Sequence, residues 1–252
     1  MPRMLVTGAS SGFGLAIART FLAKGWDVVA TMRDPNSNPL PASDRLTVLP
    51  LDVTDEKSIE SAVAAAGPLD ALVNNAGVGM LNVLEGAEME KVRELFETNV
   101  LGAMAMTRVV LPDMRIREAG VIVNVSSSVT LKPLPALSVY SASKAALNAF
   151  TESLALEAGL FGVRARLVLP GSAPATGFGK IAVARMGMEI PAPYTAFVHD
   201  YLATLRSGTL FTTPEDVAEA VWQAVTDDNA PMMIPAGADA WALFDEQDHA
   251  TA

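Results

Sequence analysis

The sequence predicts one α/β domain spanning residues 1–252, built as a doubly wound sheet of seven parallel strands with helices on both faces. Seven short apolar segments alternate with helical patterns along the chain. A glycine-rich turn follows the first of these segments and opens a helix. Half of the 252 residues are apolar, which is enough for a large core, and no repeat or linker divides the chain.

The first predicted strand, Arg3–Thr7, leads directly into a turn with the spacing Gly-x3-Gly-x-Gly. Gly8 permits a tight turn, Gly12 lets the backbone approach a pyrophosphate, and Gly14 permits close packing of the helix that follows. The N-terminus of that helix offers unpaired N–H groups and the positive end of its dipole. We therefore expect a dinucleotide to bind here, at Gly8, Ser10, Ser11, Gly12, Phe13 and Gly14.

The second predicted strand, Asp27–Met32, should end beside the adenosine ribose of that dinucleotide. An NAD site needs an acid there for the 2′-hydroxyl, but Arg33 follows the strand, and a guanidinium suits a 2′-phosphate. Asp34 comes one residue late, although a shifted turn could bring it to the ribose. Arg33 could also be an ordinary solvated loop residue. The sequence favours NADP(H) over NAD(H).

The third predicted strand, Leu46–Leu51, is followed by Asp52 and Val53. Asp52 could accept a hydrogen bond from the adenine amino group while Val53 packs on the ring. Thr54 could also be the N-cap of a helix expected over Asp55–Ala65. Both interpretations can hold together.

Amides and small residues follow the fourth predicted strand, Leu69–Val73. We expect Asn75, Ala76 and Gly77 to let a cofactor approach the backbone, although an ordinary turn has a similar composition.

A long helical pattern then runs from Glu88 to about Met114 and contains Asn99 and, three residues later, Gly102. A buried amide in a helix needs a partner. Asn99 could bind a water that hydrates Lys144, or it could only cap or kink the helix.

The stretch Val121–Phe150 carries the residues best suited to chemistry. It begins as a β-branched strand with Ser127 at its carboxyl end and continues as a helix on which Tyr140 and Lys144 share one face. A neighbouring ammonium favours the phenolate, so we expect Lys144 to lower the pKa of Tyr140 and make it a proton-transfer group, while Ser127 holds the substrate oxygen. A hydride must then come from a cofactor. A chance Tyr-x3-Lys pair and a plain serine loop are the alternatives.

The sixth predicted strand, Val163–Leu169, ends at Pro170 and Gly171, again on the cofactor edge. Residues 172–210 form an irregular segment that we interpret as a substrate lid. Within it, Phe197, Val198, Tyr201, Leu202 and Leu205 recur at helical spacing. Its expected lining is apolar and comprises Met186, Met188, Ile190, Tyr194 and Phe197. Ordinary packing or a subunit contact would produce the same pattern.

Thr213, Pro214 and two acids begin a helix that runs to about Val225. Pro231–Pro235 is expected as a short last strand and Trp241–Phe244 as a terminal helical turn.

Composition excludes several kinds of protein. A formal net charge of −10 argues against nucleic acid and anionic membrane surfaces as partners. The absence of Cys excludes disulfides and thiolate nucleophiles, and His199 and His249 lack metal-ligand spacing. No apolar run approaches the roughly 20 residues needed to span a bilayer. The first strand begins at once, leaving no room for a signal sequence, so we expect a cytoplasmic protein.

Taken together, these motifs resemble those of the short-chain dehydrogenase/reductase family over nearly the whole chain. The resemblance implies a Rossmann-type fold and an oxidoreductase that is usually a homotetramer or homodimer, with interfaces on the helices around Asn99 and Tyr140. It implies that Tyr140 is the general acid/base, that Lys144 binds the nicotinamide ribose, that Ser127 orients the substrate, with Ser126 as its competitor, and that Asn99 anchors a relay water. The motifs that carry it are Thr7-Gly8-x3-Gly12-x-Gly14, Asp52-Val53, Asn74-Asn75-Ala76-Gly77, Asn99, Ser126-Ser127, Tyr140-x3-Lys144 and Pro170-Gly171.

Two details refine the resemblance. Met32-Arg33 is similar to the members that prefer NADP(H), and the stretches ATMRDP and PAGADAW are similar to retinol- and steroid-type dehydrogenases. The family often places a Thr soon after Pro-Gly, whereas here Thr176 is displaced by one residue, which puts the carboxamide contacts in question.

The leading hypothesis is a reductase or dehydrogenase that transfers a hydride between NADP(H) and the carbonyl or alcohol of a small, neutral, fairly apolar substrate. One alternative is a nucleotide-sensing protein without chemistry. Another is an epimerase or dehydratase of a sugar nucleotide, for which the lid offers as basic residues only Lys180, Arg185 and Arg206.

Overall fold

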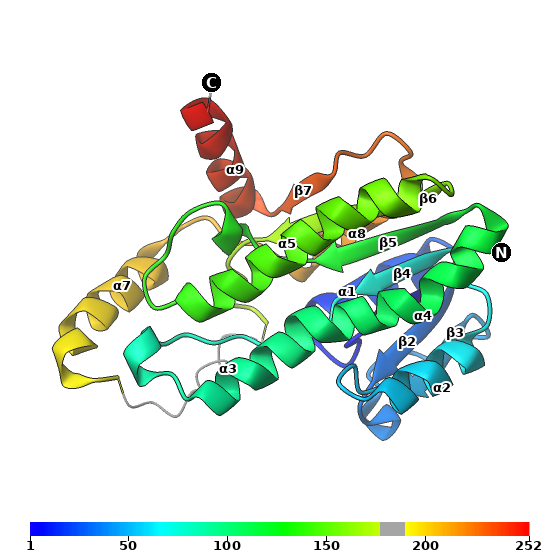
Figure 1. Ribbon diagram of the computed structural model, residues 1–252, viewed down its shortest axis with the longest axis horizontal. Coiled ribbons are helices and arrows are strands. Elements are labelled where there is room, and N and C mark those ends of the chain that lie inside the picture. The colour runs from blue at the N-terminus through cyan, green and yellow to red at the C-terminus, as the bar shows by residue number, and fades with distance from the viewer. Residues whose placement is uncertain (177–189, 252) are drawn as a thin grey trace.

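The computed structural model describes residues 1–176 and 190–251 (Figure 1). These residues form a seven-stranded parallel sheet in the order β3-β2-β1-β4-β5-β6-β7. The strand order reverses between β1 and β4, which confirms the doubly wound architecture and places a crevice at that point. The strands are β1 (Arg3–Thr7), β2 (Asp27–Met32), β3 (Leu46–Pro50), β4 (Ala71–Asn74), β5 (Gly120–Val125), β6 (Val163–Pro170) and β7 (Met233–Ala236).

Helices cover both faces of the sheet, as predicted. On one face lie α1 (Gly12–Ala23) and α8 (Pro214–Thr226). On the other lie α2 (Glu56–Ala66), α4 (Gly102–Arg117) and α5 (Ser138–Gly159), the last two crossing the near side in Figure 1.

The alternation of side chains along a strand explains the two cores. In β1, Met4 and Val6 point to the face of α1 and α8, whereas Leu5 points to the face of α2, α4 and α5. Both faces are apolar because a parallel sheet is buried on both sides.

The predicted long helix from Glu88 to Met114 is interrupted. It consists of α3 (Met89–Phe96), a π-helical turn (Glu97–Leu101) and α4, which extends three residues beyond the predicted end. Gly102, the first residue of α4, packs closely against Val53 in the loop after β3. A Cβ at Gly102 would lie only 2.9 Å from the Val53 side chain, so the contact requires glycine. Asn99, for which capping or kinking the helix was one of two alternatives, lies within this π-helical turn.

Four strands differ from the predictions by one or two residues at one end or both. β4, β6 and β7 each end one residue later than predicted, at Asn74, Pro170 and Ala236. Leu51 is not part of β3, which ends at Pro50. β4 begins at Ala71, two residues after Leu69, whose carbonyl accepts a hydrogen bond from the Arg117 guanidinium. β7 begins at Met233, two residues after Pro231, which has no N–H to donate.

Helix capping corrects one assignment and confirms another. Thr54 is not the N-cap of α2; Asp55 is, and its carboxylate accepts from the Lys57 N–H at 2.9 Å. Thr213 caps α8 in a capping box with Asp216, as its sequence predicts.

Two of the last three helices, α7 (Thr195–Ser207) and α9 (Ala238–Thr251), lie at the carboxyl edge of the sheet. α7 contains the predicted amphipathic repeat, and α9 is much longer than the single turn expected. α9 stands out from the end of β7 in Figure 1. In the described part of the chain, every helix is too short or too polar to cross a membrane.

Candidate active site

One cavity of about 1390 Å³ lies at the carboxyl edge of the sheet, where the strand order reverses. Almost all the residues that the sequence singles out line it, from the ends of six strands and from α5. These residues are Gly8, Ser10, Ser11, Gly12, Phe13, Arg33, Asp52, Val53, Asn75, Ala76, Gly77, Ser127, Tyr140, Lys144, Pro170 and Gly171. Gly14 and Asn99 lie behind this lining.

The turn between β1 and α1 has the shape that a dinucleotide phosphate requires. Gly8 and Gly12 have φ angles of +73° and +54°, which disfavour residues with a side chain. A Cβ on Gly14 would lie only 2.3 Å from the Gly8 carbonyl oxygen. Within the described residues, the Ser11 side chain makes no capping hydrogen bond, so it does not occupy the N–H groups at the start of α1. The turn therefore fits a phosphate bound by backbone N–H groups.

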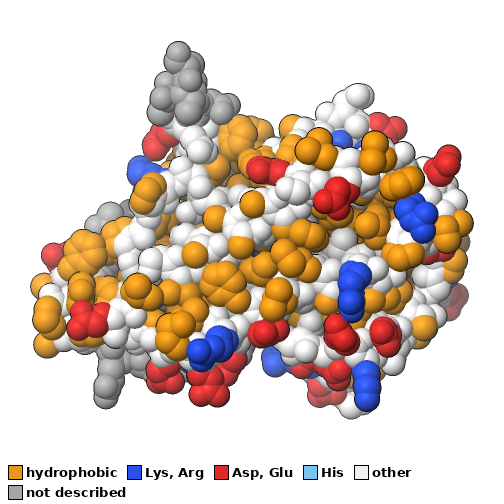
Figure 2. Space-filling view, viewed as in Figure 1, with side chains coloured by type: hydrophobic (Ala, Val, Ile, Leu, Met, Phe, Trp, Pro, Cys, Tyr) orange, Lys and Arg blue, Asp and Glu red, His pale blue; other side chains and the backbone are white. Residues whose placement is uncertain are grey.

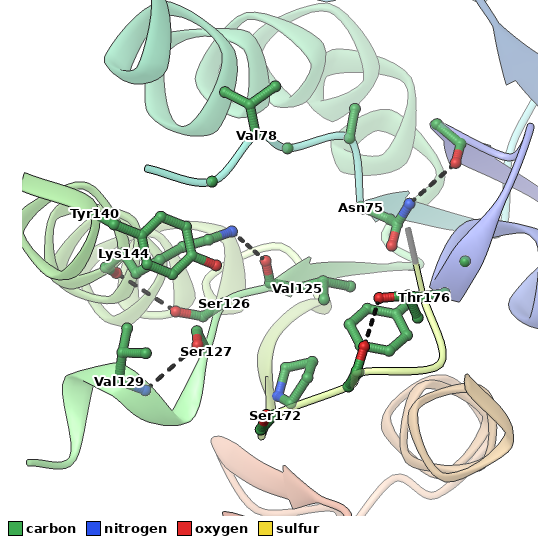
Figure 3. A pocket seen from close by; sticks show the side chains of 18 of the residues that line it. Asn75, Val78, Val125, Ser126, Ser127, Val129, Tyr140, Lys144, Ser172 and Thr176 are labelled. Atoms are coloured by element: carbon green, nitrogen blue, oxygen red, sulfur yellow. Dashed lines mark hydrogen bonds between the residues drawn. The ribbon is translucent and has the colours of Figure 1, made fainter. Parts of the chain in front are cut away.

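The Asn75 side chain forms hydrogen bonds within the protein, to the backbone of the glycine turn. Its amide donates to the Thr7 carbonyl at 2.8 Å and to the Gly8 carbonyl at 3.3 Å. The Thr7 hydroxyl in turn accepts from the N–H groups of Asn75 and Ala76. These bonds tie the end of β4 to the glycine turn, across the cavity from Tyr140 (Figure 3).

Arg33 and Asp52 form the end of the cavity at β2 and β3. Hydrogen bonds from the backbone and hydroxyl of Thr54 lower the pKa of Asp52, with a smaller contribution from Arg33. Both bonds go to Oδ1, at 3.0 and 2.8 Å. Arg33 is exposed on the cavity wall.

Ser127, Tyr140 and Lys144 meet on the opposite side, where β5 ends beside α5 (Figure 3). All three are buried. The Ser127 Oγ accepts from the Val129 N–H at 3.3 Å, and the Lys144 Nζ donates to the Val125 carbonyl at 3.0 Å. Ser126 also lines the cavity, but its hydroxyl donates to the Asn148 Oδ1 at 2.5 Å, whereas the Ser127 side chain is hydrogen-bonded to Tyr140. The structure thus brings together Ser127, and not Ser126, with Tyr140.

The expected lowering of the pKa of Tyr140 is wrong for this structure. Burial raises the pKa of Tyr140 to about 12, and a hydrogen bond with Ser127 opposes this shift only in part. Burial also lowers the pKa of Lys144 to about 8. Burial is the main cause of both shifts, because desolvation favours the neutral phenol and the neutral amine.

Asn99 has the partner that its burial requires. Its side chain accepts from the Val78 N–H at 2.8 Å and donates to the Val78 carbonyl at 2.9 Å. It also donates to the Ser143 hydroxyl at 3.2 Å. Asn99 therefore fixes the loop after Gly77, where an added Cβ would lie 3.7 Å from the Lys144 Nζ. The water expected at Asn99 remains a prediction.

Both ends of the predicted lid line the cavity, through Ser172, Ala173, Pro174, Thr176, Tyr201, Leu202, Gly208 and Leu210. Of its expected apolar lining, Ile190 and Tyr194 instead pack with Val198, Val83 and Ala136, and Phe197 is 55% exposed. Met186, Met188, Lys180 and Arg185 lie outside the described residues, as do the side chains of Leu205 and Arg206.

Several lining residues were not predicted. Leu134 and Leu137 lie in the proline-rich loop before α5, Phe211 precedes α8, and Ala242 and Leu243 come from α9. Apolar side chains in irregular segments near the site could have indicated that these residues line the cavity. Nothing local in the sequence places α9 at the cavity. Thr176 lines the cavity too, with its hydroxyl donating to the Ala173 carbonyl at 2.8 Å.

Comparisons with known proteins agree with this geometry. The family model for short chain dehydrogenases matches residues 2–183. YusZ of Bacillus subtilis, an uncharacterized oxidoreductase, is 40% identical over 237 residues, which are 88% of this chain and 84% of YusZ. Human retinol dehydrogenase 8 is 34% identical over 246 residues, covering 91% of this chain and 79% of that protein.

Solved structures show the same relationship. A short-chain dehydrogenase from Streptomyces avermitilis matches with a TM-score of 0.85 and 32% identity, covering 100% of this chain and 94% of the other. Similar solved structures include complexes with NADP+ and with NAD, so the likeness implies a dinucleotide without choosing between the two. The chain belongs to the short-chain dehydrogenase/reductase family, whose members are NAD(P)-dependent oxidoreductases acting on CH–OH groups.

Proposed function

We propose that the protein transfers a hydride between NADP(H) and the carbonyl or alcohol of a neutral, fairly apolar substrate. The observation that carries this proposal is the meeting of Ser127, Tyr140 and Lys144 in the cavity that also contains the glycine turn. Proton transfer and dinucleotide binding are therefore available at one place.

The division of labour follows from the side chains. A bound nicotinamide cofactor would supply or accept the hydride. Tyr140 gives a proton to the substrate oxygen or takes one from it, and Ser127 holds that oxygen by a hydrogen bond. Because its pKa is raised, Tyr140 is protonated at neutral pH, which suits the donation that carbonyl reduction requires. Lys144 supplies positive charge beside the phenol and a donor for the cofactor ribose.

The chemistry of the lining supports a neutral and fairly apolar substrate. Its wall beyond Tyr140 includes the apolar side chains of Val129, Leu134, Leu137, Leu202, Phe211 and Leu243. The charged groups near the α3 side are mostly acidic: Glu90, Glu94 and Glu97 line the cavity together with Arg93. Lys132 is paired with Glu246 at 3.3 Å. An anionic substrate would meet more repulsion than attraction here.

The preference for NADP(H) is supported by the loop after β2. Arg33 lines the cavity and is exposed, so its guanidinium can meet a 2′-phosphate. Asp34, the alternative ribose ligand, has its Oδ1 occupied by the backbone and side-chain N–H groups of Asn36, both at 3.0 Å. A carboxylate held in its own turn is poorly placed to bind a ribose.

We also propose a homodimer or homotetramer that uses the face of α4 and α5. Figure 2 shows apolar side chains spread over this face. Leu156 of α5 and Leu160, which follows the last residue of α5, are 79% and 81% exposed. Sedimentation velocity would test this, with a monomeric wild type as the contradicting result.

The decisive experiment for the reaction is incubation with NADPH and a panel of apolar ketones and aldehydes while the nicotinamide absorbance is followed. Turnover with at least one carbonyl compound is expected. Tight NADPH binding without turnover would favour a nucleotide-sensing protein, and turnover of a sugar nucleotide without net oxidation would favour an epimerase.

A further inference from the structure

Asp239, at the start of α9, holds the loop that follows β6. Its Oδ2 accepts from the Ser172 N–H at 2.5 Å, and its Oδ1 lies 2.7 Å from the Thr212 hydroxyl. Thr212 is 1% exposed and its hydroxyl accepts from the Gly171 N–H at 2.9 Å. The Thr212 backbone N–H also donates to the Ser172 carbonyl at 2.8 Å. Two side chains from distant parts of the chain thus fix consecutive N–H groups of one turn.

The packing around these bonds leaves no space for a different arrangement. A Cβ on Gly171 would lie 2.2 Å from the Asp239 carboxylate oxygens. A Cβ on Gly237 would lie 2.1 Å from the Thr212 Oγ1, and Gly237 has a φ of +95°. Both glycines are therefore required for the carboxylate and the hydroxyl to reach the turn.

The tied groups all border the active-site cavity or support its wall. Pro170, Gly171, Ser172 and Asp239 line the cavity, as does Leu243 one turn further along α9. The turn lies at the carboxyl end of β6, at the edge where the glycine turn and Tyr140 also lie. A shift of Asp239 would move the turn and the apolar wall together.

We propose that Asp239, acting through Ser172 and Thr212, is a positioning residue that sets the Pro170–Ser172 turn and α9 for hydride transfer. This inference rests on the proposed function. The required property is hydrogen-bond geometry rather than negative charge. In an Asp239→Asn variant, the amide oxygen can accept from Ser172 and the amide N–H can donate to Thr212, whose own proton can go to the Ala236 carbonyl at 2.7 Å.

The test compares a disruptive and a conservative substitution at each of Asp239 and Thr212. Asp245→Ala is the control, because Asp245 is an exposed acid on the same helix as Asp239. We expect Asp239→Ala and Thr212→Val to lower kcat about tenfold at saturating NADPH and ketone, and Asp239→Asn and Thr212→Ser to stay within about threefold of wild type. Each variant is assayed well below its own melting temperature. A purely structural role would lower that temperature and leave kcat unchanged.

A second readout needs no cofactor. Amide hydrogen exchange at Gly171 and Ser172 should become faster in Asp239→Ala but not in Asp239→Asn or Asp245→Ala. Unchanged exchange and kcat in Asp239→Ala would overturn the inference, as would an Asp239→Asn variant as impaired as Asp239→Ala. If the wild type reduces no carbonyl compound while exchange responds as expected, the proposed function fails and the structural tie stands.

Discussion

The Lys144 ammonium lies 6.0 Å from the centroid of the Tyr140 ring, one helical turn away on the buried face of α5. This arrangement buries both groups in the wall of one cavity. The phenol consequently holds its proton more tightly than a free tyrosine, and the amine holds its proton less tightly than a free lysine.

Removal of the Tyr140 hydroxyl should abolish turnover. We expect Tyr140→Phe to lower kcat by about 100-fold or more, the usual contribution of a general acid. NADPH affinity, measured by fluorescence titration, should change little, because the ring and Lys144 remain. Tyr201→Phe is the matched control: Tyr201 also lines the cavity, but in the described part of the chain its hydroxyl has no hydrogen-bond partner. Near-normal turnover by Tyr140→Phe would contradict the assignment.

The reductive reaction should lose rate in mildly alkaline solution. Below pH 8 Lys144 is charged and Tyr140 is protonated, the forms that the reduction needs. As pH rises through about 8, Lys144 loses its charge while Tyr140 keeps its proton, so kcat/KM for the carbonyl substrate should fall. The measurement is kcat/KM from about pH 6 to 10 at saturating NADPH. A profile that stays level across this range would show that the charge of Lys144 is not required.

Lys144→Met should inactivate the enzyme and stabilise the fold. A buried lysine with a pKa of about 8 is charged less readily than in the unfolded chain, a penalty on the order of 3 kcal/mol at neutral pH. The lost hydrogen bond to Val125 offsets about 1 kcal/mol of the gain. Thermal unfolding should therefore shift upward by a few degrees. Lys57→Met, at an exposed position of α2, should leave the melting temperature almost unchanged.

Arg33→Ala should change the choice of cofactor. Loss of the guanidinium is expected to weaken NADPH binding about tenfold and to leave NADH binding nearly unchanged. Arg19→Ala, an exposed arginine outside the cavity lining, controls for the loss of one positive charge. Tighter binding of NADH than NADPH by the wild type at equal salt would refute the NADP(H) preference.

The sequence predicts the seven strands, the glycine turn and the grouping of Ser127, Tyr140 and Lys144 because each depends on local patterns. Alternating strands and helices give the sheet, and the four-residue spacing puts Tyr140 and Lys144 on one face. The direction of the Tyr140 pKa could not be predicted, because spacing records the neighbouring charge but not the burial that outweighs it.

Other features depend on contacts between distant parts of the chain. The tie from Asp239 to Ser172 joins residues that are 67 positions apart, so no local pattern indicates it. Asn99 could be recognised as a buried amide in need of a partner, but its bonds to Val78 arise only when α3 and the loop after β4 pack together.

The position of β1 in the middle of the sheet, between β2 and β4, has a consequence for synthesis of the chain on the ribosome. β1 is made first, yet one of its edges stays unpaired until Ala71–Asn74 has emerged. The nascent chain must therefore keep an apolar strand edge soluble while more than sixty further residues are added. A deletion that reaches Arg3–Thr7 would remove an interior strand of the sheet, whereas Met1, just before it, is 83% exposed.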